Sequence, residues 1–149
     1  MQPEPVVFVI DDDEAIREST KYFLKNEGYL VTAARNGDEA LDLFAHSAYD
    51  LVISDIFMPG TDGLDTIAEM KKRNIDLKIL AISGVEMKDE FLEMAGMYGA
   101  GKKLSKPFSR QQLVKTVAEM FGEEEKGKDE LLKKSLSAFR EGFNNARTQ

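Results

Sequence analysis

Five charged residues stand where short apolar runs of the sequence end, and they are Asp11, Asp12, Asp13, Asp55 and Lys106. A further apolar run, LKILAI, ends in Ser83. A carboxylate next to a divalent cation can act as a nucleophile toward phosphorus. A nearby lysine and hydroxyl would then bind the oxygens of the transferring phosphoryl group. These residue types therefore indicate phosphoryl-transfer chemistry, provided that the fold brings them together.

Clustered carboxylates also indicate a metal ion. Two of them about 4 Å apart repel by roughly 1 kcal/mol in water and by roughly 4 kcal/mol at an effective dielectric constant of 20. Such a cluster persists when a cation offsets the repulsion. Ligands that are all oxygen favour a hard cation, and Mg²⁺ uses one or two carboxylates together with waters and phosphate oxygens.

The apolar runs alternate with amphipathic stretches, which is typical of buried parallel strands separated by helices. The predicted strands are residues 6–10, 29–34, 51–54, 77–82 and 103–105. The predicted helices are residues 14–26, 38–45, 64–72, 86–97 and 109–121. This alternation predicts an α/β fold with a doubly wound parallel sheet. Ligands of such sheets bind outside the carboxyl ends of the strands, where the charged residues stand.

Composition limits the class of protein. The 149 residues include no cysteine, which excludes disulfides, zinc sites with cysteine ligands and thiol catalysis. No apolar stretch approaches 18 residues, and the start of the chain does not resemble a signal peptide, so we expect a cytoplasmic protein without membrane contact. The net charge of −7 lies in residues 1–122, because residues 123–149 hold six acids and six bases. An acidic body disfavours nonspecific nucleic-acid binding, and none is expected within this chain.

Two apolar stripes remain. Met87, Phe91, Met94 and Tyr98 follow helical spacing, and we expect them to pack onto the sheet. In the final segment, we expect residues 123–128 to form a charged hinge or a solvated continuation of the preceding helix. An amphipathic helix to about residue 144 is then expected to carry Leu132, Leu136, Phe139 and Phe143. This helix would pack back on residues 1–122, extend into a dimerising coil, or be the start of a longer chain, and docking or dimerisation is slightly favoured.

The ordered motifs VIDDDEAIRE, DLVISDIFMPGTDGL, LKILAISG and KKLSKPF closely resemble the receiver domain of two-component response regulators, of the chemotaxis-regulator type. The resemblance covers residues 5–122, so the expected domains are a receiver at 1–122 and a helical extension at 123–149. It implies a five-stranded sheet of flavodoxin-like order 2-1-3-4-5. It also implies a signalling protein that catalyses only its own phosphorylation and dephosphorylation.

By this resemblance, Asp55 is the phosphoacceptor, which takes a phosphoryl group from the phosphohistidine of a sensor histidine kinase or a phosphotransfer protein. Asp12, Asp55 and the backbone carbonyl of Phe57 would hold Mg²⁺, and Asp11 would act through water. Lys106 would contact a phosphoryl oxygen.

The resemblance further implies that Ser83 donates its hydroxyl to the phosphoryl group and that the peptide bond between Lys106 and Pro107 is cis. Receivers often carry an aromatic switch residue three positions before this lysine, where the chain has Lys103. A lysine stem can pack, but its ammonium resists burial, so Lys103 is expected to stay outside.

Other polar residues have structural interpretations. Asp13 is expected to cap the following helix, Asp50 to cap the entry to a strand, and Asp62 and Asp65 to serve in a turn or cap. His46 is expected on the surface. Downstream, the partner is an unknown protein, and a homodimer would form through the final helix or through the face of residues 86–97, 103–105 and 109–121.

Three alternatives for function stay open at this point. A flavodoxin-like electron carrier needs a phosphate loop after the first strand, where this chain has DDDEA. A phosphatase of the haloacid dehalogenase type would place its nucleophile on the first strand, in a DxD motif, and the arrangement of Lys106 and Ser83 fits a receiver better. A scaffold that is not phosphorylated would not need the complete set of pocket residues.

Overall fold

The computed structural model describes residues 4–58, 61–84 and 89–122. Five strands form one parallel sheet in the order β2-β1-β3-β6-β7, which is the predicted order 2-1-3-4-5 when these strands are counted along the chain. They are β1 (Val6–Ile10), β2 (Leu30–Ala34), β3 (Leu51–Asp55), β6 (Lys78–Ser83) and β7 (Lys102–Ser105). The predicted fold class is confirmed.

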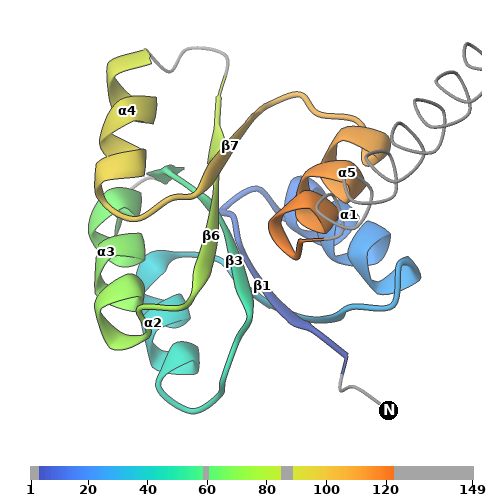
Figure 1. The fold of residues 1–149 in the computed structure, drawn as a ribbon, viewed down its shortest axis with the longest axis horizontal. Helices are drawn as coiled ribbons and strands as arrows, with labels where there is room; N and C mark the ends of the chain where they lie inside the picture. The colour runs from blue at the N-terminus through green and yellow to red at the C-terminus, as the bar shows by residue number, and fades with distance from the viewer. Residues whose placement is uncertain (1–3, 59–60, 85–88, 123–149) are drawn as a thin grey trace, which may run out of the picture. The chain divides into compact units, whose positions relative to one another are not determined.

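Over the described residues, four helices connect these strands and a fifth follows β7, as predicted. They are α1 (Glu14–Asn26), α2 (Gly37–Phe44), α3 (Gly63–Arg73), α4 (Asp89–Met97) and α5 (Arg110–Met120). The helices α2, α3 and α4 cover one face of the sheet, and α1 with the start of α5 covers the other (Figure 1). All strands therefore have their carboxyl ends at the same edge of the sheet.

The core follows the alternation of side chains along the strands. On the face covered by α2 and α3, Phe8, Val52 and Ile79 are fully buried and cluster with Ile67 of α3. Tyr49 packs edge-on against Phe8, with ring centroids 4.6 Å apart. Every residue of β3 is buried, which is why its sequence lacks an apolar–polar alternation.

Short polar contacts fix the ends of the elements. The carboxylate of Asp13 accepts the backbone N–H of Ile16 at 3.2 Å and so caps α1. The carboxylate of Asp50 accepts the N–H of Val6 at 2.8 Å, at the entry to β1. His46 is exposed, and so is Asp65 in the first turn of α3. These predictions are confirmed, whereas the side chain of Asp62 lies outside the described residues.

A short hairpin between β3 and α3 was not predicted. It pairs β4 (Phe57–Met58) with β5 (Thr61–Asp62) in antiparallel register. Gly63 then begins α3 so close to the chain at Ile56 that a Cβ atom on Gly63 would lie 2.7 Å from the Cα of Ile56. Sequence reasoning expected a turn or cap at Asp62 and Asp65 but missed this contact, which depends on how α3 docks.

The prediction that the stripe on α4 packs onto the sheet is wrong for the two members whose side chains are described. Met94 is 39% exposed and Tyr98 is 38% exposed. The small residue Ala95 is fully buried and belongs to the core cluster instead. Among the described side chains, Ala95 therefore faces inward, whereas Met94 and Tyr98 do not. Met87 and Phe91 lie outside the described side chains.

Contacts divide the chain into two units, Met1–Thr116 and Val117–Gln149, and the second is described only over residues 117–122. The predicted hinge and helix of residues 123–149 lie outside the described residues, and the predicted domain boundary at residue 122 stays a prediction. Among the helices described, none is long and apolar enough to cross a membrane.

Candidate functional site

The carboxyl ends of four strands bring the predicted site residues to one edge of the sheet. Asp55 is the last residue of β3 and Ser83 the last of β6, whereas Asp11 follows β1 and Lys106 follows β7 directly. The register aligns Asp55 with Ile82, one residue before Ser83. These four residues are far apart in the sequence, and they meet because the parallel strands end at the same level.

The ammonium of Lys106 lies between two buried carboxylates. Its Nζ atom is 2.8 Å from Oδ2 of Asp55 and 2.9 Å from Oδ2 of Asp11. Asp11 is only 3% exposed and Asp55 only 5%. The cis peptide bond predicted between Lys106 and Pro107 is present. The contact between Lys106 and Asp11 was not predicted, because nothing in the sequence says which of three neighbouring aspartates turns inward.

The carboxylate, the N–H and the carbonyl of Asp11 all form hydrogen bonds. Its Oδ1 atom accepts the N–H of Asp13 at 2.9 Å, and its own N–H donates to the carbonyl of Ala34 at 3.2 Å. Its carbonyl accepts Nη1 of Arg17 at 2.9 Å. Sequence reasoning missed Arg17. The available signal was its place one turn into the helix that follows Asp11, from which a long side chain can reach back to the strand end.

Three carboxylates could share a cation. Asp11, Asp12 and Asp55 each offer an oxygen, and these oxygens all lie within 4.8 Å of one another. Two oxygens bound to one Mg²⁺ at about 2.1 Å lie at most about 4.2 Å apart, so small side-chain shifts suffice. All donors are carboxylate oxygens, which suits a hard divalent cation. Asp12 is exposed and therefore accessible from solvent.

Burial and charge shift the pKa values of the ion pair. Burial raises the pKa of Asp11 above its usual 3.8, and the charge of Asp55 adds to this, against the lowering effect of Lys106 and the N–H of Asp13. Burial alone would lower the pKa of Lys106, but hydrogen bonds and charges from Asp55 and Asp11 outweigh it and raise that pKa above 10.5. One ammonium thus pairs with two carboxylates. The ammonium stays charged, whereas the negative charge of Asp11 is only partly offset.

Serine side chains stand at or next to the ends of β3, β6 and β7. Ser83 is 1% exposed, its Oγ donates to Oγ of Ser105 at 3.3 Å, and its carbonyl accepts the N–H of Lys106 at 2.7 Å. Ser54 is fully buried, and its Oγ donates to the carbonyl of Asp55 at 3.0 Å. Sequence reasoning did not single out Ser54 or Ser105, although each directly precedes a site residue.

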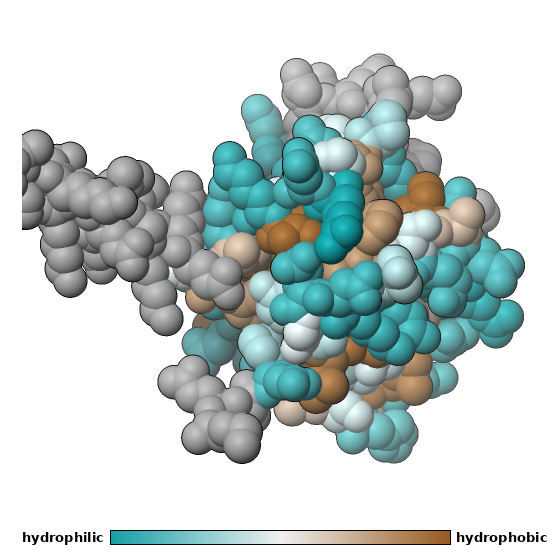
Figure 2. Space-filling model, turned by 90° about the vertical axis from the view of Figure 1, so that its right-hand side faces the viewer, coloured by the Kyte–Doolittle hydropathy of each residue, from teal (hydrophilic) through white to brown (hydrophobic). Residues whose placement is uncertain are grey.

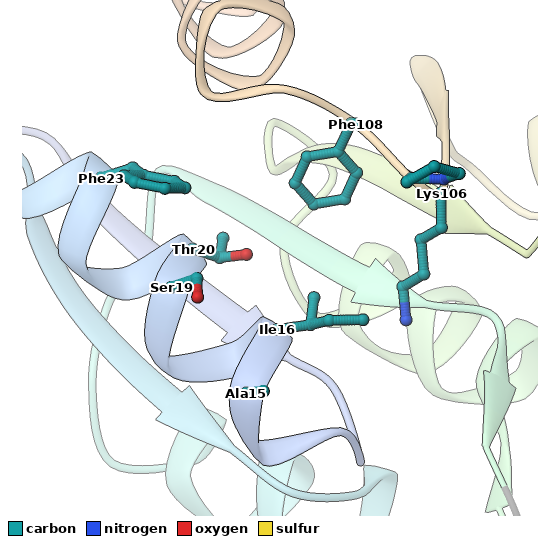
Figure 3. A pocket seen from close by; sticks show the side chains of 8 residues that line it. Ala15, Ile16, Ser19, Thr20, Phe23, Lys106 and Phe108 are labelled. Atoms are coloured by element: carbon teal, nitrogen blue, oxygen red, sulfur yellow. The ribbon is translucent and has the colours of Figure 1, made fainter.

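An apolar groove of about 430 Å³ borders this site. Side chains of α1, including Ile16 and Phe23, form one wall, and Pro107 and Phe108 form the other, with Lys106 at one end (Figure 3). On the face of the molecule seen in Figure 2 the surface is largely hydrophilic and carries only separate apolar patches. Because its walls are mainly apolar and Lys106 lies at one end, the groove offers apolar contact next to the charged cluster.

Two predicted residues stand at the margin of the site. Phe57 begins β4, two residues after Asp55, and its role through the backbone carbonyl stays a prediction. Lys103 lies in β7 beside Ala81 and is exposed, as predicted. The position three residues before Lys106 therefore carries a charge directed to solvent.

The chain is similar to known signalling proteins. The response regulator MprA of Mycobacterium sp. (strain KMS) is 38% identical over 109 residues, which is 72% of this chain and 46% of that protein. The chain thus spans about half the length of the curated relatives it matches.

Solved structures give the same result. The chemotaxis protein CheY4 of Vibrio cholerae superposes with a TM-score of 0.74 at 28% identity, over 79% of this chain and 99% of that one. The receiver domain of NtrX from Brucella abortus superposes with a TM-score of 0.72 at 31% identity, over 76% and 96%. The family model of the response regulator receiver domain matches residues 7–118. With its strand order and the cluster of acids and lysine at the strand ends, the chain belongs to the response regulator receiver domain family.

Proposed function

We propose that Asp55 accepts a phosphoryl group from the phosphohistidine of a sensor histidine kinase or phosphotransfer protein, and that its phosphorylation switches a protein–protein interaction surface. The observation that carries this proposal is the contact of 2.8 Å between Nζ of Lys106 and Oδ2 of Asp55, inside a cluster of three acids. A strand-end carboxylate beside an ammonium is suited to receive a group that itself carries negative charge.

The transfer exchanges one bond for another. An oxygen of Asp55 attacks phosphorus, a P–O bond forms, and the P–N bond to the imidazole breaks. The imidazole, protonated on its other nitrogen, leaves as a neutral ring. Little covalent chemistry is required of the protein, so positioning and charge stabilisation account for the acceleration.

Mg²⁺ would be held by Asp12, Asp55 and the backbone carbonyl of Phe57, with Asp11 acting through water. When bound, the ion neutralises charge on the phosphoryl oxygens and the carboxylates. The contacts of Asp11 support its indirect role, because both of its carboxylate oxygens already accept hydrogen bonds, from Asp13 and Lys106. Asp12 is exposed and can turn toward the ion.

Lys106 and Ser83 would bind two oxygens of the phosphoryl group. Lys106 already touches the acceptor, so its ammonium needs only a short movement from the carboxylate to a phosphoryl oxygen. Ser83 ends the strand next to β3 and is buried, so its hydroxyl exchanges one protein acceptor for another and not for water.

The partners follow from this chemistry. The phosphodonor must reach Asp55, and the apolar groove beside Lys106 offers it a contact surface. The downstream protein is unidentified, and a homodimer would form through the face of α4, β7 and α5 or through residues 123–149. Because the curated relatives are about twice as long, the activity of the whole protein is part of this proposal. The role is signalling, with catalysis limited to gain and loss of the phosphoryl group.

Phosphorylation by a small donor tests the proposal without a kinase. The protein is incubated with acetyl phosphate, with and without Mg²⁺, and its mass is measured intact. We expect one added phosphoryl group that requires Mg²⁺ and is absent from Asp55→Asn. Asp42→Asn, a change at an exposed acid of α2, serves as the matched control and should react like the parent. Mg²⁺-independent labelling, or labelling that survives Asp55→Asn, would refute the assignment.

A further inference from the structure

A pair of hydroxyls joins the ends of β6 and β7 beside the acceptor. Ser83 and Ser105 are register partners in the two parallel strands, and Oγ of Ser83 donates to Oγ of Ser105 at 3.3 Å. The two side chains differ in environment, since Ser83 is 1% exposed and Ser105 is exposed. The buried hydroxyl is thus tied to one that water can reach.

Burial leaves Ser83 few acceptors. Its backbone carbonyl already accepts the N–H of Lys106 at 2.7 Å, so both the carbonyl and the side chain of Ser83 are bound to the end of β7. A buried hydroxyl without a partner is costly, because it can no longer bond to water. Ser105 therefore supplies the acceptor that Ser83 uses while no phosphoryl group is present.

We propose that Ser105 is a positioning residue that holds the hydroxyl of Ser83 away from Asp55 until the phosphoryl group arrives. This inference rests on the proposed function, in which Ser83 donates to a phosphoryl oxygen. A hydroxyl has a single proton to donate, so donation to Ser105 and donation to the phosphoryl group exclude each other. Ser105 thus stabilises the unphosphorylated form and sets how readily the switch moves.

The direction of the effect follows from the burial of Ser83. Replacing Ser105 with alanine removes the competing acceptor and leaves the buried hydroxyl unpaired in the free protein, so the phosphorylated form is favoured. A neutral hydrogen bond changes an equilibrium constant by about 2- to 10-fold. The length of 3.3 Å places the expected effect at the lower end, about 2- to 4-fold.

The test measures the affinity for beryllofluoride, a phosphoryl mimic, in saturating Mg²⁺, from the backbone amide signal of Gly84 in NMR titrations. The variants are Ser105→Ala, Ser105→Thr, Ser83→Ala and the double variant with alanine at both positions. Ser105→Thr keeps the oxygen acceptor. Ser47→Ala, at an exposed serine after α2, is the matched control. The dissociation constant for Mg²⁺ alone is measured for every variant.

The inference expects tighter beryllofluoride binding for Ser105→Ala, parent-like binding for Ser105→Thr, and no effect of Ser105→Ala once Ser83 is alanine. Unchanged or weaker binding by Ser105→Ala overturns it, and so does an equal gain in the Ser83→Ala background. A parallel change in Mg²⁺ affinity also overturns it, because Ser105 would then shape the whole pocket. If the parent itself binds no beryllofluoride in Mg²⁺, the proposed function fails and the inference fails with it.

Discussion

Removing the charge of Lys106 probes the centre of the site. Lys106→Met keeps a long side chain but deletes the ammonium that lies 2.8 Å from Asp55 and 2.9 Å from Asp11. Two carboxylates that are 5% and 3% exposed would then face each other without this ammonium. We expect a lower free energy of unfolding in the absence of divalent cations.

The magnitude is bounded from two sides. At an effective dielectric constant of 20, each ion contact is worth roughly 6 kcal/mol and the carboxylate repulsion roughly 3.5 kcal/mol, before desolvation of the ammonium offsets much of the attraction. The variant can also relieve the repulsion by protonating one carboxyl. At pH 7 this costs about 4 kcal/mol for an acid of ordinary pKa. The expected loss is therefore about 2 to 4 kcal/mol.

The loss should depend on pH with a definite sign. Burial already raises the pKa of Asp11 above 3.8, and without Lys106 the pKa of Asp11 rises further. The folded variant then binds this proton more tightly than the unfolded chain does, so its stability increases as the pH falls from 7 through the raised pKa. The difference from the parent should shrink as the pH is lowered from 7, and saturating Mg²⁺ should shrink it at pH 7.

Urea unfolding followed by circular dichroism, with chelator or with Mg²⁺, measures these quantities. Lys103→Met is the matched control, since Lys103 lies exposed on β7, and it should change stability by less than about 0.5 kcal/mol. The reasoning is refuted if Lys106→Met is as stable as the parent in chelator, or if neither lower pH nor Mg²⁺ reduces its deficit.

Three other changes test separate features. Asp12→Asn should weaken Mg²⁺ binding at least about 10-fold, measured by calorimetry. Its free energy of unfolding should stay within about 0.5 kcal/mol of the parent value, because Asp12 is exposed. Unaltered Mg²⁺ affinity would contradict this prediction. Gly63→Ala should lower the free energy of unfolding in urea by about 1 to 3 kcal/mol, because its Cβ would meet the backbone of Ile56. Gly96→Ala in α4, which has open space around it, should raise this free energy by up to about 1 kcal/mol. Equal effects of the two glycine changes would argue against the close contact. Asp13→Ala should cost about 1 kcal/mol by thermal unfolding through loss of the α1 cap, and Asp13→Ser should recover most of it.

Local patterns were enough to predict the elements. The runs that become β1, β3 and β6 are apolar without alternation, as strands buried on both faces must be. Each end of these strands lies within one residue of the predicted end. The cap at Asp13 was also predictable, because a cap depends on residues within one turn.

Prediction failed where distant residues decide the outcome. The stripe with Met94 and Tyr98 has the spacing of a buried face, but α4 docks through Ala95. The docking of Gly63 against Ile56 and the reach of Arg17 to the carbonyl of Asp11 likewise depend on how helices lie against the sheet. Helical periodicity says that a face is apolar, and the neighbouring element determines which side of it is covered.

The sequence by itself determined the kind of chemistry, since it carries aspartates, a serine and a lysine at the ends of strands that run parallel. Tertiary structure alone decided which of these groups contact one another and which are exposed. It turned Asp11 inward to Lys106 and left Asp12 exposed, although the two are neighbours with identical side chains. It also paired Ser83 with Ser105. Strand register and burial set these contacts, and both arise from packing across the sheet between residues far apart in the chain.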